Sequence, residues 1–113
     1  IRTMNDHQRE QATRFNVKVV PVNKSPRDIE LEFSEPVYIS IDLDGLDPAY
    51  APGVSHPEPG GLSTRDIINF ISNIEGEIIG ADIVEYNPYK DINEITAITA
   101  AKLLKELMGK IIE

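Results

Sequence analysis

Three aspartates follow an apolar run in the middle of the chain and are the residues best suited to chemistry. Asp42, Asp44 and Asp47 stand at positions i, i+2 and i+5 directly after residues 37–41. The run has the β-branched and aromatic composition of a strand buried on both faces. If the extended geometry persists through Asp44, the alternation of a strand points the carboxylates of Asp42 and Asp44 to the same side. Two such carboxylates repel each other, and a hard cation such as magnesium, manganese or calcium would offset that cost.

A further acidic residue stands at the end of another predicted strand. Residues 77–86 have the composition of a buried strand, with Glu85 near the C-terminal end and Asn87 and Pro88 after it. Strands separated by helices predict an α/β fold, with a parallel sheet covered on both faces by helices. Because ligands bind beyond the carboxyl ends of parallel strands, we expect Asp42, Asp44 and Glu85 to meet in one crevice.

Capping residues and apolar periodicity predict the remaining elements. Asn5, with Gln8 three residues later, resembles a capping box and predicts a helix over residues 6–15. Ser63 or Thr64 caps a second helix that ends near residue 74. We also expect a strand at 17–22, a surface connection at 23–36 with a short helical piece at 28–33, a long rigid loop at 45–61 and a helix at 92–112. The aliphatic residues of that last helix that can face the sheet are Ile95, Ile98, Leu103, Leu107 and Ile111.

Composition restricts the class of protein. The chain has 113 residues, 41% of them hydrophobic, which suits one domain with a core. Its formal net charge of -8 disfavours nucleic acid as a partner. It has no cysteine, which excludes disulfides, cysteine-ligated zinc and thiol catalysis and agrees with a cytoplasmic location. We expect no membrane helix and no signal peptide, and the start at Ile1 instead of Met suggests a piece of a longer protein.

The aspartates could also belong to a calcium loop, a phosphatase site or a capped turn. A calcium loop of the EF-hand type that began at Asp42 would have Gly53, and not glutamate, at its twelfth position. The D-x-D-G pattern resembles haloacid-dehalogenase phosphatases, but these usually have threonine where this chain has Leu46. The aspartates could also simply cap a turn. Asp47 precedes Pro48, and we expect it to fix the loop and not to bind metal.

The wider pattern resembles the ureohydrolase family of arginases and agmatinases. Its core is the S-x-D-x-D-x-x-D-P string that begins at Ser40, followed by A-P-G at 51–53, P-E-P-G-G-L at 57–62 and E-Y-N-P at 85–88. Parts of the last helix and the opening Ile1-Arg2 are also similar to that family, so the resemblance spans nearly the whole chain. It implies a three-layer α/β/α fold with a parallel sheet, in which residues 1–113 would be the C-terminal part of a single domain.

The resemblance also implies an activity and roles for site residues. Members of this family hydrolyse guanidinium groups to urea with two manganese ions bridged by a hydroxide. By position, Asp42 and Asp44 match metal-binding aspartates, and Glu85 matches the glutamate that holds the substrate guanidinium. His56 stands where many members have threonine, and we expect it to line the substrate mouth.

Departures from the family pattern bear on substrate and activity. Thr3 and Asn5 stand where arginases carry acidic residues that contact the amino-acid end of arginine, which favours agmatine as the small-molecule substrate. The upstream G-G-D-H-S and D-A-H-x-D segments are absent, so we expect residues 1–113 alone to be inactive. His7 is expected to be solvent-exposed in its polar helix. We also expect a homo-oligomer. An arginase, another guanidino-acid hydrolase and a noncatalytic assembly fragment remain as alternatives.

Overall fold

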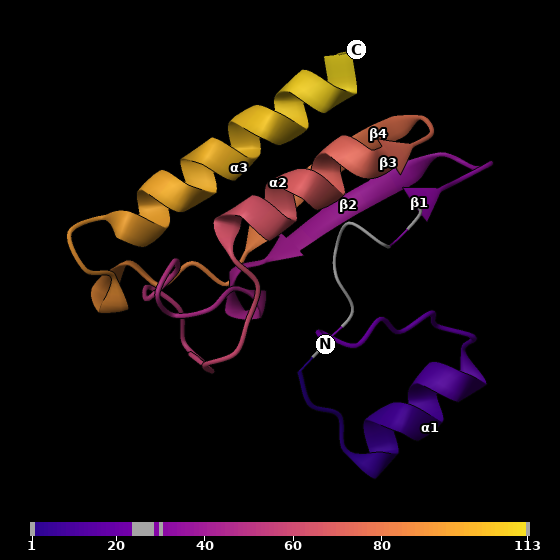
Figure 1. The fold of residues 1–113 in the computed structure, drawn as a ribbon, viewed down its shortest axis with the longest axis horizontal. Coiled ribbons are helices and arrows are strands. Elements are labelled where there is room, and N and C mark those ends of the chain that lie inside the picture. The colour runs from indigo at the N-terminus through magenta and orange to yellow at the C-terminus, as the bar shows by residue number, and fades with distance from the viewer. Residues whose placement is uncertain (1, 24–28, 30, 113) are drawn as a thin grey trace.

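The computed structural model describes residues 2–23, 29 and 31–112, in which two pairs of consecutive strands separate three helices (Figure 1). None of the described helices is long and apolar enough to cross a membrane. Short 3₁₀ turns follow β2 at Leu43–Gly45 and precede the last helix at Pro88–Lys90. The helices and strands are α1 (Asp6–Arg14), β1 (Leu31–Glu32), β2 (Val37–Asp42), α2 (Thr64–Asn73), β3 (Ile74–Glu75), β4 (Ile78–Val84) and α3 (Ile95–Ile112).

The strands form two parallel pairs, β2 with β4 and β1 with β3. In the longer pair Val37 lies opposite Ile78 and Asp42 lies opposite Val84, so the carboxyl ends of β2 and β4 coincide. The ring of Tyr38 packs over Gly80, where an added Cβ would lie only 2.9 Å from a ring carbon. The predicted parallel pairing is confirmed, and this register brings the segments that follow Asp42 and Val84 to the same edge.

Helices α2 and α3 lie side by side along the β2–β4 pair (Figure 1). Ser63, one of the two predicted caps, begins α2 and forms a capping box with Asp66, and the helix buries Ile68 and Ile71. These side chains belong to a core whose buried members also include Ile41, Leu43, Leu46, Ala51, Val54, Leu103 and Leu107. The core therefore reaches from the strands into the turn and loop that follow β2.

The expectation that residues 37–41 are buried on both faces is wrong for the described chain. Ile41 is buried and Ile39 is partly buried, but Tyr38, Ser40 and Asp42 are exposed. The reason is that α2 and α3 pack on the side of Ile39 and Ile41, and no described helix covers the other side. Ser40 and Tyr38 instead donate hydrogen bonds to the carboxylate of Asp82 on β4, at 2.6 and 3.0 Å.

Helix α1 lies apart from the sheet, near the N-terminus (Figure 1). The predicted capping box is confirmed, because Asn5 accepts from the Gln8 amide and Gln8 accepts from the Asn5 amide. His7 is exposed on this helix, as expected. The predicted strand at 17–22 is wrong: the described residues offer it no strand neighbour, and a strand forms only where another can complete its ladder.

The connection before β2 also differs from prediction. Leu31 and Glu32 pair with Ile74 and Glu75 as strands β1 and β3, where a short helix over 28–33 was expected. The two-residue ladder satisfies backbone groups that a single helical turn would leave unpaired. Residues 28 and 30 of the expected helix lie outside the described residues.

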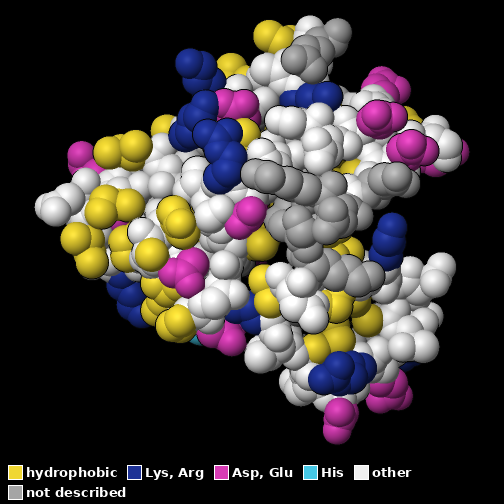
Figure 2. Space-filling model, viewed as in Figure 1, with side chains coloured by type: hydrophobic (Ala, Val, Ile, Leu, Met, Phe, Trp, Pro, Cys, Tyr) yellow, Lys and Arg dark blue, Asp and Glu magenta, His cyan; other side chains and the backbone are white. Residues whose placement is uncertain are grey.

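Helix α3 begins at Ile95 and not at residue 92. Of the five residues predicted to face the sheet, Leu103 and Leu107 are buried, as is Thr96, whereas Ile95, Ile98 and Ile111 are exposed, Ile98 to 65%. Spacings of four and seven residues place Thr96, Ala100, Leu103 and Leu107 on one helix face, and Ile98 lies off that face. Figure 2 shows hydrophobic side chains at the surface on the side of the molecule where α3 begins.

Candidate metal and substrate site

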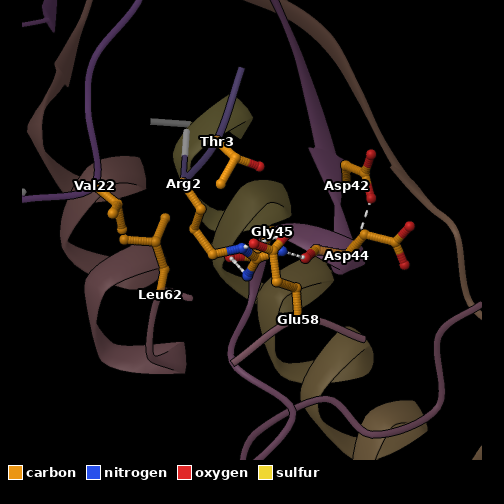
Figure 3. Close-up of a pocket in the computed structure, with 8 residues that line it drawn as sticks. All are labelled: Arg2, Thr3, Val22, Asp42, Asp44, Gly45, Glu58 and Leu62. Carbon is orange, nitrogen blue, oxygen red and sulfur yellow. Dashed lines mark hydrogen bonds and ion pairs between the residues drawn. The ribbon is translucent and has the colours of Figure 1, made fainter. Parts of the chain in front are cut away.

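The end of β2 places two carboxylates next to each other. The strand ends at Asp42, and the 3₁₀ turn Leu43–Gly45 follows with Leu43 fully buried beneath it. Oδ1 of Asp42 accepts a hydrogen bond of 2.8 Å from the amide of Asp44. In Figure 3 the carboxylates of Asp42 and Asp44 point to the same side of the turn. The extended geometry does not persist through Asp44, so a capped turn, and not strand alternation, brings the acids together.

Asp44 carries an unsatisfied oxygen. Its side chain is only 20% exposed, and the buried Oδ1 has no hydrogen-bond partner among the described residues. The other oxygen, Oδ2, lies 3.3 Å from Nδ1 of His56. A buried carboxylate oxygen without a donor is costly, and a cation would offset that cost. The donor chemistry at Asp44 therefore fits a hard divalent metal ion.

Glu85 directly follows β4 and has a strained backbone. Its φ angle is +67°, in the left-handed region that costs a residue other than glycine about 1–3 kcal/mol. The following segment holds this conformation, because Tyr86 forms a bridge with Val54 and the Asn87 amide donates to the Gly53 carbonyl at 2.8 Å. The loop after β2 and the loop after β4 are thus tied together beside Glu85.

Asp44, His56 and Glu85 form one cluster. One ligand atom from each residue lies within 4.8 Å of the others. His56 is 83% exposed and Glu85 is also exposed, so the cluster opens to solvent. The structure therefore brings together three of the four predicted site residues, and Asp42 adjoins the cluster through its hydrogen bond to the Asp44 amide. The separate roles predicted for the four residues remain predictions.

A hollow of about 290 Å³ adjoins the turn, has Asp42 and Asp44 in its lining and is shown in Figure 3. The guanidinium of Arg2 extends across it toward the backbone of the turn, and Thr3 lies beside Arg2. Arg2 was noted in the sequence only within the opening pair Ile1-Arg2, and no local pattern indicated its long-range contacts. The residues that line the hollow are Arg2, Thr3, Val22, Asp42, Asp44, Gly45, Glu58 and Leu62.

Asp47 fixes the long loop, as predicted. Its carboxylate accepts from the amide of Ala49 at 2.9 Å and from the amide of Gly60 at 2.8 Å. These hydrogen bonds, with smaller contributions from the Gly61 amide and the charge of Arg2, lower the pKa of Asp47 below its ordinary value. The two ends of the loop are therefore held close together by one side chain.

A second loop anchor was missed in the sequence. Oγ1 of the buried Thr96 accepts a hydrogen bond of 2.7 Å from the Gly53 amide. The neighbouring carboxylate of Asp91 accepts from the amides of Ile92, Thr96 and Ala97. Burial raises the pKa of Asp91, but hydrogen bonds from Thr96, Ala97 and Ile92 outweigh it and lower the pKa to about 2.

This anchor also explains why α3 begins at Ile95 and not at the predicted residue 92. Asn93 and Glu94 have φ angles of +49° and +59°, so the chain makes a left-handed turn before the helix. The Asp91 carboxylate then caps the first amides of α3 from outside the helix. The position of Asp91 just before a predicted helix could have indicated the cap. No sequence pattern indicated that Gly53, in the distant loop, would pair with Thr96.

Comparisons with known proteins agree over nearly the whole chain. A family model described as the Arginase family matches residues 1–109. The mitochondrial arginase 1 of Arabidopsis thaliana is 47% identical over 119 aligned residues, which cover 98% of this chain and 35% of the relative. The chain thus spans about a third of the length of that curated relative.

Two further comparisons concern the fold and a related activity. The crystal structure of a triple mutant of the Trypanosoma brucei arginase-like protein, bound with Mn²⁺, superposes with a TM-score of 0.92 at 32% identity, and the match covers 99% of this chain and 40% of that one. The mitochondrial agmatinase of Gallus gallus is 47% identical over 74 residues, which cover 65% of this chain and 22% of the relative. The expected α/β fold with parallel strands is therefore confirmed, and this chain corresponds to part of the larger fold of the Trypanosoma brucei neighbour.

Proposed function

We propose, from the premise that this chain belongs to the arginase family, that its protein hydrolyses the guanidinium group of a linear guanidino compound to urea and an amine. The observation that carries the proposal is the cluster in which Asp44, His56 and Glu85 approach within 4.8 Å beside Asp42. A phosphatase interpretation of the D-x-D-G pattern loses its basis, because the family match accounts for that segment. In this proposal residues 1–113 form the C-terminal part of a single ureohydrolase domain.

Manganese is the metal that we propose for the site. Asp42 and Asp44 would hold it, and the buried, unpartnered Oδ1 of Asp44 supports this choice. Carboxylate oxygens suit this hard ion, and the Mn²⁺ in the Trypanosoma brucei neighbour is consistent with it. When bound, the metal lowers the pKa of a coordinated water and so supplies the nucleophile. Two manganese ions are expected. Asp42 and Asp44 would fill only a few of the coordination positions of these ions, and other residues would have to supply the remainder.

Glu85 is the residue that we propose for the substrate guanidinium. A carboxylate can accept two parallel, charge-assisted hydrogen bonds from this planar cation. Glu85 is exposed and lies in the same cluster as Asp44, so a substrate held by Glu85 would lie beside the proposed metal site. Its left-handed backbone supports the same role, because strain of this kind concentrates at functional sites.

His56 is proposed to line the substrate mouth, since its imidazole is exposed and faces Asp44. The substrate that we favour is arginine, because the plant arginase matches 98% of the chain, whereas the chicken agmatinase matches 65%. Agmatine remains the second candidate, which Thr3 and Asn5 support because neither supplies a carboxylate for the amino-acid end of arginine. Nucleic acid and a membrane are not expected as partners.

Assembly and location complete the proposal. Exposed hydrophobic side chains on α3, among them Ile98 and Met108, support self-association into a homo-oligomer. The name of the Arabidopsis relative places that protein in mitochondria, and the cytoplasmic location inferred from the lack of cysteine stays a prediction. We further propose that residues 1–113 alone release no urea, because they supply too few metal ligands.

The test is urea release from arginine and from agmatine by the native protein with Mn²⁺. We expect urea from at least one of the two, and its loss in D44N. The matched control is D6N, which removes a carboxylate from the exposed first turn of α1. Absence of urea with both compounds, in a folded and manganese-loaded protein, would contradict the proposed activity. Residues 1–113 expressed alone provide a separate assay of the inactivity that we propose for them.

A further inference from the structure

The side chain of Arg2 joins three segments that are distant in the sequence (Figure 3). Its Nη2 donates to the carbonyl oxygen of Asp44 at 2.6 Å. Its Nη1 lies 3.4 Å from the carbonyl oxygen of Leu46 and 3.5 Å from that of Gly45. Its Nε lies 3.5 Å from Oε2 of Glu58. The guanidinium thus contacts consecutive carbonyl groups of the turn that carries Asp44.

The chemistry of the turn explains why an arginine fits there. Carbonyl groups at the end of a helical turn have no partner within the turn and need an outside donor. A guanidinium offers five N–H groups in a rigid planar fork, which can serve several carbonyls at once, whereas an ammonium is a compact point charge. The side chain of Arg2 is only 15% exposed, so water competes little for these contacts.

The loop after the turn leaves room for the guanidinium only because residue 61 is glycine. A Cβ added at Gly61 would lie 2.3 Å from Nη1 of Arg2 and 2.5 Å from the amide nitrogen of Asp47. The amide of Leu62, next in sequence, donates to the Gly45 carbonyl at 3.1 Å. Arg2 is therefore enclosed between the turn and the end of the long loop.

The backbone of Asp44 is consequently held on both sides. Its amide donates to Asp42 at 2.8 Å, and its carbonyl accepts from Arg2 at 2.6 Å. Rotation of either flanking peptide group would move the Asp44 carboxylate. The buried Oδ1 of this carboxylate has no hydrogen-bond donor among the described residues. The two contacts hold the backbone from which this carboxylate extends, and the carboxylate lies on the side of the turn opposite the Arg2 guanidinium (Figure 3).

We propose that Arg2 is a positioning residue for the metal site: its guanidinium holds the Asp44 carbonyl so that the Asp44 carboxylate is preorganised to bind Mn²⁺. This inference rests on the proposed function, because it assumes that Asp44 is a metal ligand. It adds a residue from the N-terminal end of the chain that acts through Asp44 and is not itself a metal ligand. Residues that orient metal ligands typically contribute 10-fold to 100-fold to metal affinity.

The test compares R2K and R2M with the native protein, and R9K serves as the control because the Arg9 side chain forms an exposed 4.0 Å pair with Asp6 within α1. Mn²⁺ affinity is measured from the electron paramagnetic resonance signal of the free ion, and thermal unfolding is measured in the same samples. We expect about 10-fold weaker Mn²⁺ binding in R2K and a larger loss in R2M, each with an altered spectrum of the bound ion, and no change in R9K.

The outcomes separate this inference from the proposed activity. If R2K and R2M bind Mn²⁺ as tightly as the native protein, the positioning role is wrong even where urea is released. If the native protein binds Mn²⁺ but releases no urea, the activity fails and the affinity of R2K still decides the inference. R2K keeps the charge and the aliphatic stem, so it decides the matter if R2M does not fold. If neither variant folds, or the native protein binds no Mn²⁺, the inference is overturned.

Discussion

Nδ1 of His56 lies 3.3 Å from Oδ2 of Asp44, so a histidine from the long loop touches an aspartate from the turn after β2. The family resemblance implies different tasks for these two residues, substrate contact for His56 and metal binding for Asp44. The contact places the residue proposed for the substrate directly beside the residue proposed for the metal. It also allows the roles to be separated by measuring metal affinity and substrate affinity independently.

Replacing His56 with alanine should weaken substrate binding and leave the metal in place. We expect H56A to raise KM about 5-fold, which corresponds to ~1 kcal/mol for one lost hydrogen bond, with kcat and Mn²⁺ affinity nearly unchanged. Steady-state kinetics and a Mn²⁺ titration of the native protein check this. H7A, on the exposed face of α1, is the control. A large fall in Mn²⁺ affinity would instead identify His56 as a metal ligand.

Replacing Glu85 with glutamine should remove recognition of the guanidinium cation. The amide is nearly isosteric but neutral, so we expect E85Q to lower kcat/KM about 100-fold, or ~3 kcal/mol for a hydrogen-bonded charge. Mn²⁺ affinity should not change, and circular dichroism should show an intact fold. The control E75Q alters an exposed glutamate on β3 and should behave as the native protein does. Equal kcat/KM in E85Q and the native protein would exclude the proposed contact.

Replacing Thr96 with valine should destabilise the protein through the long loop. The change keeps the side-chain shape but leaves the Gly53 amide without the 2.7 Å hydrogen bond to Oγ1. An unsatisfied buried donor costs about 1–3 kcal/mol, and we expect a loss of that size in the free energy of unfolding. Urea denaturation measures it. T13V, which removes an exposed hydroxyl from α1, should cost much less, and equal effects of the two changes would refute the anchor.

The pH dependence of stability should include a contribution from Asp91. Its pKa is lowered from 3.8 to about 2 in the folded chain, because hydrogen bonds from Thr96, Ala97 and Ile92 outweigh the effect of burial. A carboxyl group with a lowered folded pKa stabilises the fold above its unfolded pKa, and that contribution is lost as the pH falls through the folded value. The free energy of unfolding should therefore decrease between about pH 4 and pH 2.

The variant D91N isolates that contribution. It should show a smaller decrease in unfolding free energy over the same pH interval, as measured by chemical denaturation at a series of pH values. D6N, which removes a carboxylate from the exposed start of α1, is the matched control for the loss of one negative charge. Identical profiles for D91N and the native protein would show that Asp91 does not contribute.

Local pattern predicted the elements that depend on neighbours in the sequence. The capping box at Asn5, the cap of the second helix at Ser63 or Thr64, the strands that lead to Asp42 and Glu85 and the loop role of Asp47 all follow from short-range rules. The same rules failed for the strand expected at 17–22, because a strand depends on a partner that local sequence does not identify. They also failed for Leu31 and Glu32, where pairing with β3 prevailed over a helical turn.

The sequence by itself indicated which residues could carry chemistry, because spaced aspartates after an apolar strand are costly without a partner and the string resembles one enzyme family. The tertiary structure decided their relations. The register of β2 and β4 brings the loops that hold Asp44, His56 and Glu85 within reach of one another, and the packing of the first residues against the turn gives Arg2 its contacts. These relations depend on distances between remote segments, which only the folded chain defines.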